Sequence, residues 1–115
     1  MCHVLIIEDE AMVALDLQGI LADSGATSFD IADTEASAVS QALARRPDFI
    51  TSAVRLREGT GPCAVDRIRS ALGEVPVVFV TGTPEECEPC EGDRVLTKPL
   101  EIEAIASVFR ELAPV

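Results

Sequence analysis

Three short runs of largely apolar residues limit most strongly what this chain can fold into. The runs cover residues 3–7, 49–54 and 75–80, and each leads into polar residues or a glycine-containing turn. A strand that is apolar along its whole length is buried on both faces, as in a parallel sheet covered by helices on each side. The runs therefore predict an α/β fold with the sheet at its centre.

Stretches with apolar residues at helical spacing lie between these strands. They cover residues 11–24, 34–44, 62–72 and 102–112. Gly25 and Gly73 follow the first and third as helix ends. In the second we expect Ala36, Val39 and Leu43 to face the core.

Two weaker strands, at 27–32 and 94–97, complete five strand–helix units. Residues 84–93 predict only one or two loose helical turns, because Pro89 interrupts any helix begun at Pro84. Right-handed crossovers place helices on both faces and bring the carboxyl ends of the strands to one edge. We therefore predict a doubly wound, five-stranded parallel sheet.

The length and charge of the chain restrict its organisation and its partners. With 115 residues, 48% of them hydrophobic, we expect one domain over residues 1–115 and no output domain. Twenty acidic residues against nine basic ones give a formal charge of −11, which disfavours nucleic acid and anionic membranes as partners. Neither a membrane span nor a signal peptide is indicated, so we expect a cytoplasmic protein.

Polar residues follow the strands at the predicted edge of the sheet. Glu8 and Asp9 follow the first strand, Thr81 the fourth and Lys98 the fifth, whereas Ala53 stands at the end of the third. Adjacent carboxylates repel one another, and a hard divalent cation such as Mg²⁺ is a common reason to hold them together. The alternative reading is an acidic N-terminus for the following helix, favoured by its dipole.

Four segments in this order resemble those of response-regulator receiver domains, over the whole length of the chain. They are VLIIEDE, PDFITSAVRLREGTG, VPVVFVTGT and LTKPL. The fourth strand is similar to that of single-domain receivers in alphaproteobacterial stress signalling. The resemblance implies a flavodoxin-like fold with strand order 2-1-3-4-5 and a signalling module of a two-component phosphorelay, not an enzyme.

In that family, an aspartate at the end of the third strand takes a phosphoryl group from a histidine kinase or phosphotransferase, with Mg²⁺ bound beside it. The resemblance implies that Asp9 and Glu8 hold the metal together with the backbone carbonyl of Arg55. A downstream regulator protein is a further implied partner.

The resemblance also implies roles for three residues near the phosphoryl group. Thr81 corresponds to the hydroxyl that bonds the phosphoryl group and Lys98 to the ammonium that pairs with it. Pro99 corresponds to the proline that turns the loop through a cis bond.

Two residues depart from the family pattern. Ala53 occupies the phosphoacceptor position, so this chain cannot form an acyl phosphate there and its affinity for Mg²⁺ is weakened. Val95 stands where many relatives have a switching aromatic residue. We interpret Ala53 as an aspartate-to-alanine substitution that locks the unphosphorylated state; the alternative is a natural pseudo-receiver that binds proteins without phosphorylation.

The cysteines suggest a rival function. Cys2, Cys63, Cys87 and Cys90 are too unevenly placed for a disulfide framework, so we expect thiols. Cys87 to Cys90 form a CxPC pattern typical of thioredoxin-like oxidoreductases, but the surrounding glutamates oppose thiolate formation. A zinc site is not indicated, because only one such pair exists.

Overall fold

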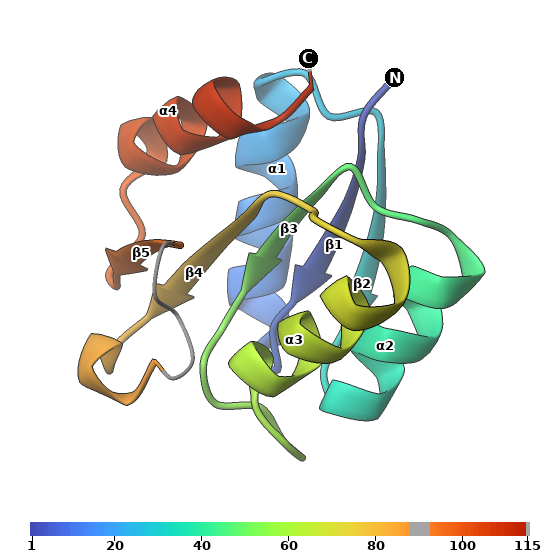
Figure 1. Ribbon diagram of the computed structural model, residues 1–115. Helices are drawn as coiled ribbons and strands as arrows, with labels where there is room; N and C mark the ends of the chain where they lie inside the picture. The colour runs from blue at the N-terminus through green and yellow to red at the C-terminus, as the bar shows by residue number, and fades with distance from the viewer. Residues whose placement is uncertain (88–92, 115) are drawn as a thin grey trace.

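The computed structural model describes residues 1–87 and 93–114. Its centre is a five-stranded sheet in the order β2-β1-β3-β4-β5, in which all paired strands are parallel (Figure 1). The strands are β1 (His3–Ile7), β2 (Ser28–Ala32), β3 (Phe49–Ser52), β4 (Val77–Thr81) and β5 (Arg94–Thr97). The predicted doubly wound fold and its strand order are confirmed.

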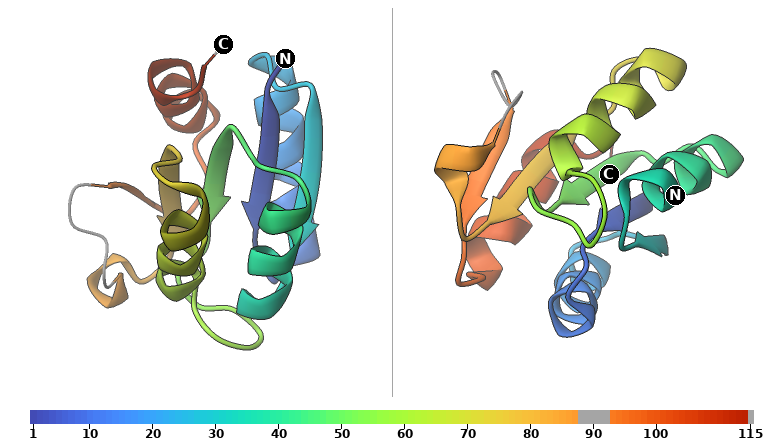
Figure 2. Two further views of the ribbon diagram at one scale, coloured as in Figure 1. Left: turned by 45° about the vertical axis from the view of Figure 1, so that its right-hand side comes forward. Right: turned by 90° about the horizontal axis from the view of Figure 1, so that it is seen from below.

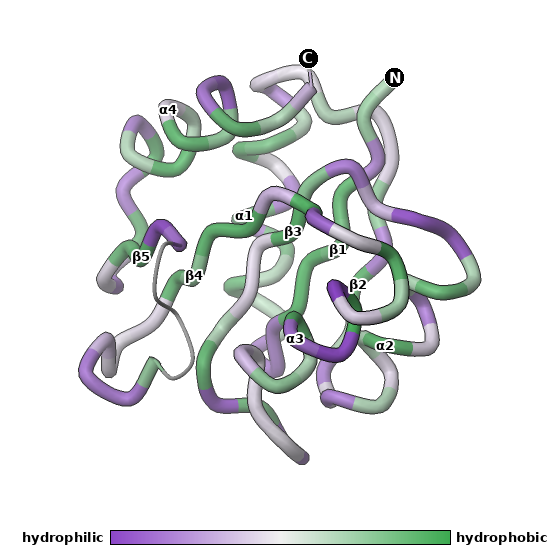
Figure 3. The backbone as a smooth tube through the Cα atoms, viewed as in Figure 1, coloured by the Kyte–Doolittle hydropathy of each residue, from purple (hydrophilic) through white to green (hydrophobic). Residues whose placement is uncertain are grey.

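Four α-helices cover the two faces of the sheet. They are α1 (Ala11–Asp23), α2 (Glu35–Ala44), α3 (Gly61–Leu72) and α4 (Ile102–Leu112). Helices α1 and α4 lie on one face, and α2 and α3 lie on the other (Figure 2). The sheet therefore separates two hydrophobic cores, and its strands β1 and β4 are hydrophobic along most of their length (Figure 3).

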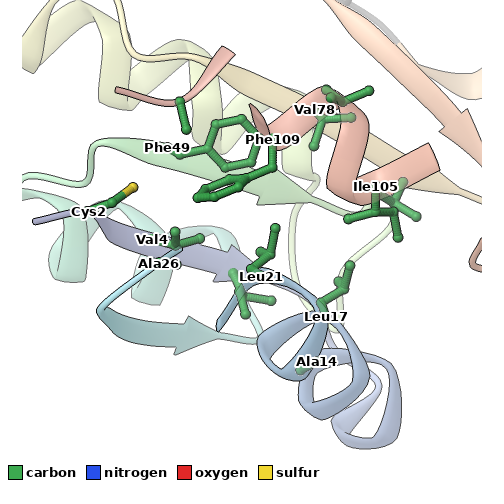
Figure 4. Packing of buried hydrophobic residues seen from close by; sticks show 14 residues of the cluster. Cys2, Val4, Ala14, Leu17, Leu21, Ala26, Phe49, Val78, Ile105 and Phe109 are labelled. Carbon is green, nitrogen blue, oxygen red and sulfur yellow. The ribbon is translucent and has the colours of Figure 1, made fainter. Parts of the chain in front are cut away.

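The core beneath α1 and α4 holds the main aromatic contact. The rings of Phe49 in β3 and Phe109 in α4 meet edge to face, with centroids 5.1 Å apart and an angle of 89° between planes (Figure 4). Leu17 and Leu21 from α1 close this core from the side. This edge-to-face arrangement is one that aromatic rings prefer. The pair therefore holds α4 against the central strand β3.

The core beneath α2 and α3 uses small residues. Ala38 and Ala42 are the buried residues of α2, whereas Leu43 is 54% exposed and Ala36 is exposed. The predicted inward stripe is therefore wrong except for Val39, which is partly buried against this core. Because alanine is frequent all round this helix, its apolar pattern does not define which face turns inward.

The segment after β4 begins with η1 (Pro84–Glu86), a single 3₁₀ turn, which agrees with the loose turn predicted there. Cys87 is disulfide-bonded, so the expectation of a thiol is wrong for this residue, while Cys2 and Cys63 are free. The prediction for Pro89 and Cys90 lies outside the described residues.

No helix in residues 1–87 and 93–114 has both the length and the apolarity needed to cross a lipid bilayer.

Candidate functional site

The carboxyl ends of four strands enclose a cavity of about 190 Å³ at one edge of the sheet, the edge seen from below in Figure 2. Its lining residues are Glu8, Asp9, Glu10, Ala53, Val54, Arg55, Thr81, Gly82, Thr83 and Lys98. The residues singled out in the sequence thus lie together, apart from Pro99. That proline follows Lys98 through a cis peptide bond.

Glu8 forms the buried floor of the cavity. It is only 2% exposed, and its Oε2 accepts a hydrogen bond of 3.1 Å from the backbone N–H of Glu10. Its Oε1 is buried and accepts no hydrogen bond. Burial raises the pKa of Glu8, and the Glu10 amide and the Lys98 ammonium offset this only in part. The floor therefore holds a buried carboxylate oxygen that makes no hydrogen bond and faces the Lys98 ammonium at 3.4 Å.

Two further carboxylates stand beside Glu8. Asp9 and Glu10 are exposed, and one oxygen from each of the three residues lies within 4.8 Å of the others. Carboxylate oxygen atoms at this spacing, on one buried and two exposed residues, fit a hard divalent cation such as Mg²⁺.

Lys98 approaches the carboxylates from β5. Its Nζ lies 3.4 Å from Glu8 Oε1 and 3.5 Å from Glu10 Oε1. Its backbone N–H donates to the carbonyl oxygen of Thr81 at 2.8 Å, which continues the pairing of β4 and β5. The sheet thus fixes the backbone from which the ammonium reaches into the cavity.

Thr81 is buried, with 4% of the residue exposed, and its hydroxyl is bonded within the turn that follows β4. Thr81 Oγ1 accepts a hydrogen bond of 3.0 Å from the Thr83 backbone N–H, and the two threonine hydroxyls lie 3.2 Å apart. A threonine that bonds the amide two residues later forms a local turn. Thr83 was missed in the sequence, although the Thr-Gly-Thr pattern carried that signal.

Ala53 is enclosed by backbone. It is 5% exposed, its N–H donates to the Ile7 carbonyl at 2.8 Å, and its own carbonyl accepts from Ser52 Oγ at 2.8 Å. Gly61 comes so close that an added Cβ would lie 1.7 Å from the Ala53 oxygen. The loop after β3 therefore packs tightly around position 53.

Arg55 and Glu86 connect that loop with η1. Arg55 Nε donates to Glu86 Oε1 at 2.9 Å, and its Nη2 contacts the same oxygen. This pairing raises the pKa of Arg55 and lowers the pKa of Glu86. The sequence pointed to the Arg55 backbone only, so the side-chain bridge was missed.

This sheet, with acids, a hydroxyl and a lysine at its carboxyl edge, defines a receiver-type signalling domain. Residues 4–110 match the response regulator receiver domain family, and the chain belongs to that family. The family and the two-component setting predicted from the sequence are confirmed.

Two curated proteins are similar to this chain over nearly its whole length. The chain is 31% identical over 115 residues to the phyllosphere-induced regulator PhyR of Methylorubrum extorquens, covering 95% of this chain and 42% of PhyR. It is 28% identical over 113 residues to the transcriptional regulatory protein DltR of Streptococcus agalactiae, covering 94% and 50%. The chain thus spans half or less of the length of these curated relatives.

Solved structures agree with the fold. The PhyR receiver domain of Erythrobacter litoralis matches with a TM-score of 0.87 at 24% identity, covering 96% of this chain and 88% of that one. A mutant of the anti-anti-sigma factor PhyR from Bartonella quintana matches with 0.82 at 26% identity, covering 96% and 48%. The chemotaxis protein CheY4 of Vibrio cholerae matches with 0.84 at 24%, covering 97% and 98%.

Proposed function

We propose that this chain is a phosphorelay receiver whose phosphorylatable form has an aspartate at position 53. The observation that supports the proposal is the convergence of Glu8, Thr81 and Lys98 on one cavity with Ala53 at its wall. An aspartate there would accept the phosphoryl group of a histidine kinase or phosphotransferase. Alanine has no atom that can attack phosphorus, so the present chain stays unphosphorylated.

Each residue has a distinct part in this scheme. Asp9, Glu8 and the Arg55 carbonyl would hold Mg²⁺, which neutralises charge on the transferring phosphoryl group. Lys98 would pair with a phosphoryl oxygen, and Thr81 would leave Thr83 to bond another. Pro99 sets the turn that follows the lysine.

We interpret Ala53 as a substituted aspartate. The cavity keeps three neighbouring carboxylates and a lysine, an arrangement whose like-charge repulsion serves no evident purpose in an idle site. The second candidate is a natural pseudo-receiver that binds partner proteins without phosphorylation. Its discriminating property is an absence of specific Mg²⁺ binding at Glu8 and Asp9.

The partner of the output step is proposed to be a protein. The similar Bartonella quintana PhyR is named an anti-anti-sigma factor. With a charge of −11, the chain disfavours direct contact with nucleic acid or an anionic membrane. We propose a cytoplasmic stress-signalling role through protein contacts. Membership in the receiver family leaves the thioredoxin-like alternative without support from the fold.

Label transfer tests the proposed function. The Ala53→Asp variant is mixed with a phosphorylated histidine kinase or phosphotransferase from the same organism, and the chain as given and Ala53→Asn serve as controls. We expect label on the aspartate variant only. Failure with every such donor would favour the pseudo-receiver, and label on Ala53→Asn would place the acceptor elsewhere.

A further inference from the structure

Glu10 stands at a position from which its carboxylate reaches the cavity and not the helix it precedes. It is the N-cap residue of α1, with extended backbone angles (φ −95°, ψ 111°), yet its side chain makes no capping hydrogen bond. Its Oε1 lies 3.5 Å from Lys98 Nζ, and its backbone N–H donates to Glu8 Oε2. Glu10 therefore does not cap α1 through a side-chain hydrogen bond.

The buried oxygen of Glu8 provides an independent indication of a cation. Glu8 Oε1 accepts no hydrogen bond, although Lys98 Nζ is 3.4 Å away. A buried carboxylate oxygen that accepts no hydrogen bond costs free energy that a bound cation would recover. Glu8 also belongs to the group in which Glu8, Asp9 and Glu10 present one ligand atom each within 4.8 Å of one another.

The charges of this group match a divalent cation even without an acid at position 53. Three carboxylates and one ammonium leave two negative charges. Lys98 is 23% exposed and lies against two of the three carboxylates, where it supplies a positive charge while no metal is bound. A metal ion that takes these oxygens meets the ammonium as a like charge.

We propose that in the Ala53 chain Glu10 supplies the third carboxylate of the divalent-cation site, beside Glu8 and Asp9, and that Lys98 competes with the cation. This rests on the metal site of the proposed function and adds a ligand to it. Glu10 thereby replaces the carboxylate that position 53 lacks. While no metal is bound, the Lys98 ammonium neutralises part of the carboxylate charge and so stabilises the metal-free state.

Direct binding measurements test the proposal with Mn²⁺ as the probe. Loss of the free Mn²⁺ electron paramagnetic resonance signal gives Kd, and displacement by Mg²⁺ is read in the same titration. The variants are Glu10→Gln and Lys98→Met, with Glu74→Gln as the charge-matched control because Glu74 is 94% exposed and lies outside the cavity. All are compared at one ionic strength, after far-ultraviolet circular dichroism has verified their folding.

We expect Glu10→Gln to raise Kd about tenfold and Lys98→Met to lower it about tenfold, since one charge near the ion is removed in each. Glu74→Gln should change Kd less than about twofold. A Glu10→Gln value equal to that of Glu74→Gln would overturn the assignment of Glu10. A Kd unchanged or raised in Lys98→Met would overturn the competition.

Asp9→Asn separates this proposal from the proposed function. If Asp9→Asn abolishes Mn²⁺ binding while Glu10→Gln does not alter it, the shared metal site stands and only the third ligand is wrong. If neither variant alters binding, the receiver metal site itself is absent.

Discussion

At the scale of single residues, the buried carboxyl of Glu8 determines the pH response of the cavity. Burial raises its pKa. A carboxyl whose pKa is higher in the folded than in the unfolded state favours folding below the unfolded pKa, and this contribution is lost as the pH rises through the folded pKa. At neutral pH without metal, Glu8 therefore costs stability.

Replacing Glu8 by glutamine tests this cost. In chelator at pH 7 we expect Glu8→Gln to raise the free energy of unfolding by about 1 kcal/mol, because the charge no longer has to be desolvated. The difference between the two proteins should shrink as the pH falls through the folded pKa of Glu8. Denaturant melts at several pH values measure it; a difference that is constant with pH would contradict the stated cause.

Gly61 offers a second test at this scale. A Cβ there would lie 1.7 Å from the Ala53 oxygen and 2.3 Å from Ser52 Oγ, so Gly61→Ala should destabilise the fold by about 3 kcal/mol or more. At Gly19, in the interior of α1, an added Cβ would have no atom within 4 Å apart from its chain neighbours and the backbone of its own helix. The control Gly19→Ala should stabilise by about 0.5–1 kcal/mol. Equal effects of the two changes in denaturant melts would disprove the close approach.

Some of the side-chain contacts in the cavity could be predicted from the sequence and others could not. The positions of Glu8, Asp9, Thr81 and Lys98 follow from strand ends meeting at one edge, and the sequence was sufficient to predict them as neighbours. The contact of Glu10 with Lys98 and that of Arg55 with Glu86 were not predictable. Both depend on side-chain directions in separate loops, which no periodicity records.

At the scale of elements, the Arg55–Glu86 bridge ties η1 to the loop after β3. The lowered pKa of Glu86 means that this contribution is present above the pKa of an unfolded glutamate and is lost as the pH falls through the folded pKa. Acid therefore weakens the ion pair that connects η1 to the loop after β3.

Breaking the bridge should loosen the 3₁₀ turn locally. In Glu86→Gln we expect faster amide hydrogen exchange at Glu86 and Cys87, whose N–H groups donate to Thr83 and Pro84 carbonyls. Glu103→Gln, which removes an exposed partner of Arg110 in α4, is the matched control and should leave these two amides unchanged. Exchange rates equal to those of the unchanged chain would show that the bridge does not hold the turn.

Element boundaries were predicted well where the sequence contains a stop signal. Gly73 ends α3 with φ 86°, as predicted. The inward face of α2 was mistaken, because its buried residues are the alanines 38 and 42. Small residues give a weak hydrophobic signal, so tertiary packing and not pattern decided the orientation of that helix.

At the scale of the whole molecule, an aspartate at position 53 should lower the stability of the metal-free protein and raise its affinity for Mg²⁺. Ala53→Asp adds a carboxylate to a cavity that already holds Glu8 and Asp9, and like charges there disfavour one another. We expect Tm in chelator to fall by about 4 °C and the stabilisation by Mg²⁺ to grow. Ala53→Asn, similar in size but uncharged, should show neither change.

Thermal melts with chelator and with Mg²⁺ decide this prediction. An aspartate form that is more stable in chelator and indifferent to Mg²⁺ would contradict the electrostatic account.

At this scale the alternation of strands and helices was enough to predict the α/β class, whereas the strand order came from the family resemblance. Periodicity describes each element, but it does not record which strands lie side by side.

The ion pairs of the cavity differ in their exposure, and ionic strength separates them. At physiological salt, charges are screened over about 8 Å in water, and exposed pairs are weakened far more than buried groups. Glu10 and the Arg55–Glu86 bridge lie at the surface, whereas Glu8 is buried. Rising salt therefore loosens the rim of the cavity first, while its floor retains a charge that ions in the surrounding solution barely weaken.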